Sequence, residues 1–133
     1  MIFVDTNYFL SFLLNRITTQ TKIVNGLFIK AATGKTTLFT SLIVIFEVYW
    51  VLARFYSKKP QETIKLISQI LNLSFIKIQE KELLVKALEV AENSQLGFYD
   101  SFNLLYAIRS KAQDFKTFDI KLQKAFERIS DII

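Results

Sequence analysis

Short apolar runs alternate with segments of helical periodicity along the 133-residue chain, and this alternation restricts the architectures open to it. Each run is only a few residues long, which suits a buried strand better than a helix. We predict strands at residues 1–4, 36–40, 75–78 and 115–118, with a further edge strand at residues 129–133. Strands that alternate with helices are typical of an α/β three-layer sandwich with a central, mainly parallel sheet, here of four to five strands.

Helices are predicted between the strands from the spacing of apolar residues and from residues that start or stop helices. Ser41 suits a helix N-cap, Gly34 a helix end, and Pro60 the first turn of a helix. The predicted helices span residues 6–14, 18–32, 41–56, 60–71, 80–93, 98–111 and 120–126. Because the chain has no repeat, low-complexity tract or linker, residues 1–133 are predicted to form a single domain.

The chain contains neither cysteine nor histidine, which removes whole classes of chemistry. Thiol and serine–histidine catalysis are excluded, as is a cysteine-based zinc site. Any bound metal must be held by oxygen atoms, and this favours Mg²⁺ or Mn²⁺ over Zn²⁺. The absence of cysteine fits a reducing compartment, and we predict a cytoplasmic protein. The net charge of +5 suits a polyanionic partner such as nucleic acid.

The most apolar stretch, residues 38–56, contains only two charged side chains, Glu47 and Arg54. A membrane helix needs about 20 apolar residues, and a carboxylate at its centre costs roughly 2.5–3.5 kcal/mol on insertion scales. The stretch also begins with strand-like residues, so we interpret it as a short strand and a buried helix rather than a membrane span. Asp5 and Asn7 interrupt the apolar N-terminus, which therefore does not look like a signal peptide.

Four acidic residues occupy positions where a solvated carboxylate is hard to explain. Asp5 and Asp119 each follow a predicted strand directly, while Glu47 and Asp100 lie in the first half of predicted helices. Carboxylates are almost never fully buried unless they are paired or bind a metal. In parallel sheets, ligands bind at the carboxyl ends of the strands, where remote parts of the chain meet. We therefore expect the four acids to share one cation site.

Each of these acids also has a purely structural interpretation. Asp5 and Asp119 suit helix N-caps, and Asp100 can stabilise a helix N-terminus through the helix dipole. Asn103, one turn after Asp100, can hydrogen-bond to it or to a substrate. Glu47 can lie at the rim of an amphipathic helix. Its neighbours at helical spacing are all apolar: Ile43, Val44, Trp50 and Val51. That environment favours a functional site over a rim position.

Four short motifs together resemble those of PIN-domain ribonucleases: Asp5-Thr6-Asn7, Glu47 in an apolar helix, Asp100-Ser101-Phe102 and Thr117-Phe118-Asp119. In length and element order the whole chain is similar to the VapC-type toxins of toxin–antitoxin pairs. The resemblance implies that Asp5, Glu47, Asp100 and Asp119 form an acidic quartet that binds Mg²⁺ or Mn²⁺. It further implies that Asn7 and Thr117 orient these carboxylates. Ser101 stands where the family often has alanine.

The same resemblance implies a metal-dependent endoribonuclease, the toxin of a type II toxin–antitoxin system, that hydrolyses phosphodiester bonds of RNA. Asp5 and Asp100 are expected to bind the metal directly, while Glu47 and Asp119 bind a second ion or hold the attacking water. Toxins of this kind usually form homodimers and are neutralised by a small antitoxin protein. The apolar helices near residues 8–14 and 42–56 can supply both surfaces.

Two other functions stay open at this point. The chain can be a non-catalytic module that binds RNA or protein, in which the acids serve as caps, or a housekeeping nuclease that processes RNA. Basic residues such as Arg54, Arg109 and Lys111 can contact phosphates, but nothing in the sequence selects among them.

Overall fold

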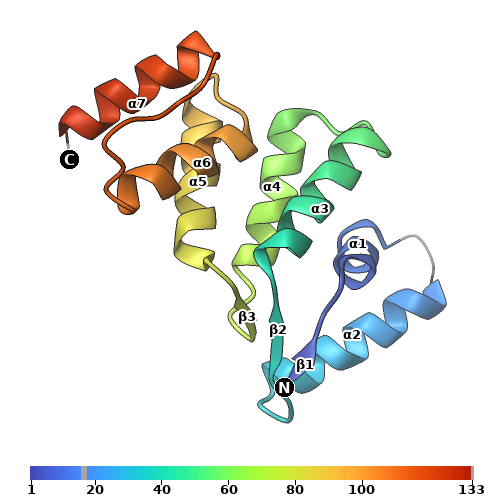
Figure 1. The fold of residues 1–133 in the computed structure, drawn as a ribbon. Coiled ribbons are helices and arrows are strands. Elements are labelled where there is room, and N and C mark those ends of the chain that lie inside the picture. The colour runs from blue at the N-terminus through green and yellow to red at the C-terminus, as the bar shows by residue number, and fades with distance from the viewer. Residues whose placement is uncertain (16–17, 133) are drawn as a thin grey trace. The chain divides into compact units, whose positions relative to one another are not determined.

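The structure, a computed structural model, describes the backbone of residues 1–15 and 18–132. Figure 1 shows the path of the chain, which divides into two compact units, Met1–Lys81 and Glu82–Ile133. The prediction that residues 1–133 form a single domain stays a prediction. Among the described residues no helix is both long and apolar enough to cross a membrane.

The first unit contains a parallel sheet and four helices. In chain order its elements are β1 (Ile2–Phe3), α1 (Thr6–Leu14), α2 (Thr18–Ala32), β2 (Leu38–Thr40), α3 (Leu42–Arg54), α4 (Pro60–Leu71) and β3 (Ile76–Ile78). The strands lie in the order β1-β2-β3, and both pairings are parallel. The predicted α/β class with a parallel sheet is therefore confirmed.

Alternation of side chains along the strands sets the two faces of this sheet. In β2 and β3, Leu38, Ile76 and Ile78 are buried, whereas Lys77 between the last two is exposed. The period of two is the expected consequence of the pleat. Helix α2 contributes Phe28 to the core. The ring of Phe28 lies 5.6 Å from the ring of Phe75, the residue directly before β3. One face of the sheet thus packs into the hydrophobic core of its own unit.

Helix ends in the first unit follow from local chemistry. Ser41 caps α3, because its Oγ accepts a hydrogen bond from the backbone N–H of Val44 at 3.3 Å. Pro60 occupies the first turn of α4, where its missing N–H leaves no unsatisfied group. Gly34 follows α2 with φ of 82°, a left-handed conformation that glycine adopts without strain. These residues confirm the predicted starts of α3 and α4 and the predicted end of α2, whereas α3 ends at Arg54, two residues before its predicted end.

The second unit is helical. It contains most of α5 (Lys81–Asn93), α6 (Phe98–Arg109) and α7 (Ile120–Ile132). Leu104 of α6 packs with Leu122, Ala125 and Phe126 of α7 to form its core. Phe115, from the segment between α6 and α7, packs against this core, with its ring 5.7 Å from that of Phe126.

The predicted strand at residues 115–118 is wrong, because this segment is irregular. Its backbone groups bond to nearby side chains instead of a neighbouring strand: Asp114 Oδ1 accepts from Phe115 N at 2.7 Å, and Thr117 Oγ1 accepts from Asp119 N at 3.0 Å. Phe115 is part of the core, whereas Phe118 is fully exposed. Side chains that compete for backbone groups favour turns over strands.

The predicted edge strand at residues 129–133 is also wrong. Residues through 132 continue α7, which therefore runs well beyond the predicted end at residue 126. Ile129 packs against the core four residues after Ala125, which is helical spacing. Ile133 lies outside the described residues. Three strands are found in the described residues, so a sheet of four to five is not confirmed, and the three-layer arrangement stays a prediction.

Candidate active site

Asp5 lies immediately beyond the carboxyl end of β1, where it caps helix α1. Its backbone is extended, with φ of −92° and ψ of 172°, and its Oδ1 accepts a hydrogen bond from Thr6 N at 2.8 Å. The side chain is exposed. One carboxylate oxygen is therefore used by the helix cap, and the second can bind a cation. Asn7, a predicted supporting residue, is exposed and lines a pocket of about 290 Å³ between α1 and α2.

A buried hydrogen bond fixes the backbone that carries Asp5. The hydroxyl of Thr40, at the end of β2, donates to the carbonyl oxygen of Val4 at 2.7 Å. Gln79 then joins β3 to the same edge: its N–H donates to Thr40 O, and its Oε1 accepts from Leu42 N, both at 3.2 Å. The carboxyl ends of the three strands are thereby tied together beside Asp5.

Glu47 is exposed in the second turn of α3, which corrects the expectation that it lies in a core-like environment. The buried side of α3 carries Val44, Ile45, Val48 and Leu52. Glu47 lies on the opposite stripe, between Ile43 and Trp50, which are 71% and 44% exposed. Its apolar neighbours are thus partly on the surface of the molecule. Exposed apolar groups around a carboxylate are typical of a binding surface.

Asp5 and Glu47 belong to the same edge of the sheet in the first unit. Phe3 of β1 pairs with Phe39 of β2, so Asp5 is level with Ser41, the N-cap of α3. Glu47 follows Ser41 by six residues, which is about 9 Å along the helix axis. Helices α1 and α3, which start from these two strand ends, pack against each other. The predicted position of both acids beyond the carboxyl ends of parallel strands therefore agrees with the structure.

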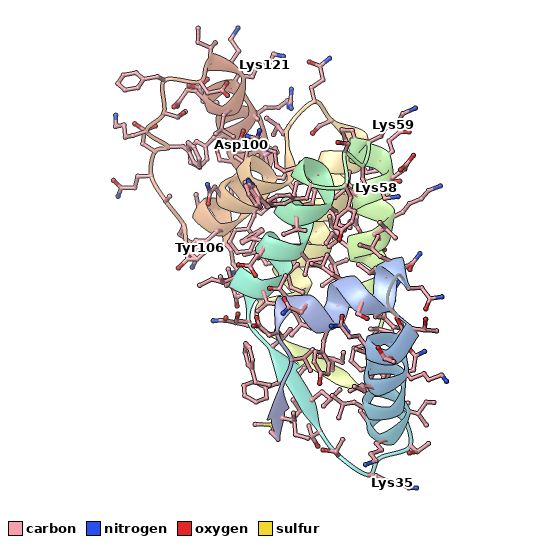
Figure 2. The ribbon with its side chains drawn as sticks, turned by 90° about the vertical axis from the view of Figure 1, so that its right-hand side faces the viewer. Lys35, Lys58, Lys59, Asp100, Tyr106 and Lys121 are labelled. Atoms are coloured by element: carbon pink, nitrogen blue, oxygen red, sulfur yellow. The ribbon has the colours of Figure 1, made fainter. Side chains whose placement is uncertain are left out.

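Asp100 lies in the first turn of α6, in the second unit, and is half-buried (Figure 2). The N-cap residue of α6 is Gly97, which supplies no side chain to the helix end. A carboxylate at this position is stabilised by the helix dipole, as the structural interpretation predicts. The next residue, Ser101, is fully buried, and its hydroxyl has no hydrogen-bond partner in the part of the chain that the structure describes. Asn103 is exposed one turn further along.

Asp119 caps helix α7. It does not follow a strand, which corrects the prediction that Asp119 comes directly after one. Its Oδ1 accepts a hydrogen bond from Leu122 N at 3.2 Å, three residues on, as an N-cap does. Thr117 holds the backbone of Asp119 by accepting its N–H, so the predicted supporting role of Thr117 has a structural counterpart. The carboxylate itself is exposed.

Each of the two units therefore holds two of the four acids. Taken singly, neither unit holds a group of three or more acidic residues placed to bind a metal, as far as the structure describes them. The joint site of all four acids stays a prediction. Within its own unit, none of the four carboxylates forms an ion pair with a described lysine or arginine. Carboxylates without a cationic partner suit a divalent cation, and their oxygen atoms are the ligands that Mg²⁺ and Mn²⁺ prefer.

Asp114, five residues before Asp119, differs from the four acids because it has a cationic partner. Asp114 forms a salt bridge with Lys116, with Oδ2 and Nζ 2.7 Å apart. The hydrogen bond from Lys116 lowers the pKa of Asp114 below its usual range, and the N–H of Phe115 acts in the same direction. Because Lys116 already balances its charge, Asp114 is a poor candidate for a metal ligand.

The sequence prediction missed an exposed aromatic pair at the end of α3. The rings of Trp50 and Phe55 lie 5.4 Å apart in a T-shaped arrangement. Both residues were treated as part of an apolar run. The sequence does contain a signal for such a pair. Apolar residues lie almost all round α3, and a helix that is buried on one side must leave some of them exposed.

Comparison with known proteins gives one match. The family model described as PIN domain matches residues 2–128, which is nearly the whole chain. Neither the search of curated proteins nor the search of solved structures found a match.

Proposed function

This chain belongs to the PIN domain family, whose members are generally metal-dependent nucleases, and we propose that it is an endoribonuclease that hydrolyses RNA phosphodiester bonds with Mg²⁺ or Mn²⁺. The observation that carries the proposal is a set of four acids, none paired with a described lysine or arginine of its own unit, in a chain that has no histidine or cysteine. Metal-bound water is a strong nucleophile at neutral pH, and its activation requires neither an imidazole nor a thiolate.

The roles of the four acids follow from their positions. Asp5 keeps one carboxylate oxygen outside its helix cap, and Asp100 is half-buried at a helix start. We assign these two as direct ligands of the metal. Glu47 and Asp119 hold the attacking water or bind a second ion. A divalent cation in such a site relieves repulsion among the carboxylates, lowers the pKa of bound water and stabilises the leaving oxygen.

We further propose that the nuclease is the toxin of a type II toxin–antitoxin pair and acts in the cytoplasm as a homodimer. The resemblance of the whole chain to VapC-type toxins supports this proposal. A reading frame for a small DNA-binding protein immediately upstream would support the toxin assignment. Light scattering at micromolar concentration tests the dimer, and a monomer would contradict it.

Cleavage of a labelled RNA tests the nuclease directly. The wild-type protein is expected to cut with Mg²⁺ or Mn²⁺ and to stop when EDTA is added. Asp5→Asn and Asp100→Asn keep the size of each side chain and one acceptor oxygen but remove its charge. Each is expected to lower the cleavage rate at least about a hundredfold.

The matched control is Asp114→Asn, which neutralises an acid of the same unit as Asp100 that is already paired to Lys116. This variant is expected to cleave at the wild-type rate. Circular dichroism of all three variants should match the wild type. If Asp5→Asn and Asp100→Asn both retain full activity, the assignment is wrong.

A specific observation supports a second candidate, the non-catalytic binding module. Asp5 and Asp119 each cap a helix, so both have a structural role that requires no metal. In that case no RNA is cut and Mn²⁺ does not raise the melting temperature. The housekeeping nuclease, by contrast, would give the same cleavage results as the toxin, and the upstream reading frame separates the two.

A further inference from the structure

The end of helix α3 carries an exposed aromatic pair that the four-acid site does not use. Trp50 and Phe55 are 44% and 72% exposed, and their rings meet edge to face at 5.4 Å and 75°. Trp50 lies three residues after Glu47 on the same stripe of the helix. Large aromatic groups exposed to water in this way are unfavourable unless a partner covers them.

Cationic residues outnumber acidic ones around this pair. Arg54 lies in the last turn of α3, and Lys58 and Lys59 follow in the turn to α4. Residues 48–61 contain no aspartate or glutamate. Figure 2 shows Lys58 and Lys59 at the α3–α4 end of the first unit, whereas Lys35 lies at the opposite end. Three cations therefore border the aromatic surface, and the acids that flank this stretch in the sequence are Glu47 and Glu62.

The turn that presents these lysines is held by its own backbone. Lys58 N donates to Leu52 O at 3.1 Å, and the carbonyl of Lys59 accepts from both N and Oγ1 of Thr63, at 2.9 and 3.0 Å. Pro60 then fixes the start of α4. These bonds hold the turn with Lys58 and Lys59 at the C-terminal end of α3, which also carries Phe55.

We propose that Trp50 and Phe55 form a stacking platform for unpaired bases of RNA, and that Arg54, Lys58 and Lys59 bind its phosphates. Aromatic rings beside cations are the usual means of holding a single strand without reading its sequence. Paired bases have no free face to stack, so the platform selects single-stranded over duplex RNA. This inference rests on the proposed ribonuclease function, since it names the form of the substrate.

An RNA strand that stacks on this platform can also reach Glu47. Arg54 lies seven residues beyond Glu47, which is about 10.5 Å along the helix axis. Stacked nucleotides rise about 3.4 Å each, so this length corresponds to about three nucleotides. Nucleotides flanking the cleaved bond would therefore lie over α3.

A partner protein is the competing occupant, because Trp and Arg are also common at the centres of protein interfaces. The excess of cations (Arg54, Lys58 and Lys59) over the flanking acids Glu47 and Glu62 favours RNA over an apolar protein surface.

Fluorescence tests the proposal independently of catalysis, because Trp50 is the sole tryptophan of the chain. An unstructured oligouridine of about 12 nucleotides, titrated in EDTA, is expected to quench this emission, and the matching duplex is expected to bind at least about tenfold more weakly. Phe55→Ala should weaken single-strand binding about tenfold. The control Ile29→Ala, which removes an apolar side chain 62% exposed on α2, should leave the affinity unchanged.

Salt dependence tests the cations. Lys59→Gln is expected to reduce the slope of log affinity against log salt by about 0.7, which corresponds to one phosphate contact on a single strand. Lys35→Gln removes an exposed lysine at the opposite end of the same unit and should not change the slope.

The outcomes separate this inference from the nuclease itself. Metal-dependent cleavage without quenching, or quenching that Phe55→Ala does not weaken, overturns the platform but not the nuclease. Quenching without cleavage supports the platform and contradicts the nuclease. If Phe55→Ala instead dissociates an oligomer and leaves RNA affinity unchanged, the surface is a protein interface and the proposal is wrong.

Discussion

The hydroxyl of Thr40 donates a buried hydrogen bond of 2.7 Å to the carbonyl oxygen of Val4, the residue directly before Asp5. Thr40 ends the central strand of the sheet, and Val4 follows the edge strand. The bond therefore holds the backbone of a proposed metal ligand against the centre of the sheet. The bond thus contributes both to the stability of the fold and to the geometry of the site.

Thr40→Val is expected to lower the free energy of unfolding by about 1–2 kcal/mol, because it leaves a buried carbonyl without a partner while nearly conserving volume. Urea unfolding followed by circular dichroism measures the change. Thr37→Val, an exposed residue just before the same strand, serves as the control and should change stability by less than about 0.5 kcal/mol. Equal stability of Thr40→Val and wild type would show that the bond contributes nothing.

Sequence reasoning placed the helices well because their ends depend on local chemistry. Ser41, Gly34 and Pro60 act within a few residues of themselves, so their effects can be inferred without knowing the tertiary fold. The same holds for the caps Asp5 and Asp119, both of which were predicted as one of two alternatives.

Strands and exposure were harder to predict. Residues 115–118 have the apolar content of a strand, yet Asp114 and Thr117 bond to the nearby backbone, and Phe115 packs on a helix. For Glu47, the sequence could not show which side of a helix that is apolar almost all round faces the core. The packing of Phe115 and the side of α3 that faces the core depend on tertiary structure, which short-range patterns do not contain.

Asp119 offers a test that separates a helix cap from a metal ligand. Asp119→Asn preserves the cap, since asparagine is an equally good N-cap, and should change stability by less than about 0.5 kcal/mol. Asp119→Ala removes the bond to Leu122 N and should cost about 1 kcal/mol. If the carboxylate takes part in catalysis, both variants lose cleavage, although only the alanine variant loses stability. Full activity in Asp119→Asn would leave Asp119 with a capping role alone.

Glu47 lies on an exposed stripe, so its removal should be structurally mild. Glu47→Gln is expected to leave the free energy of unfolding within about 0.5 kcal/mol of the wild type, as for most surface substitutions. The cleavage rate should nevertheless fall at least about a hundredfold. Glu62→Gln, an exposed acid in the first turn of α4, is the control and should keep the wild-type rate. An unchanged rate in Glu47→Gln would mean that this residue is only a solvated carboxylate.

Ser101 carries a buried hydroxyl with no hydrogen-bond partner among the described residues. Ser101→Ala removes this polar atom and replaces it with a residue of higher helix propensity, so stability should rise by about 1 kcal/mol. Thermal and urea unfolding measure the gain. Ser110→Ala, at the exposed end of the same helix, should give a smaller change. A loss of stability in Ser101→Ala would show that the hydroxyl has a partner in solution.

Metal binding should stabilise the protein if the four acids form one site. At Mn²⁺ concentrations a hundred times the dissociation constant, the free energy of unfolding should increase by about 2.7 kcal/mol, which raises the melting temperature. Because the acids come from both units, Asp5→Asn and Asp100→Asn should each remove most of this increase, whereas Asp114→Asn should retain it. EDTA should return the wild type to its lower melting temperature. If Asp100→Asn keeps the full increase while Asp5→Asn loses it, the metal is bound by the first unit without Asp100, and the proposed quartet is incorrect.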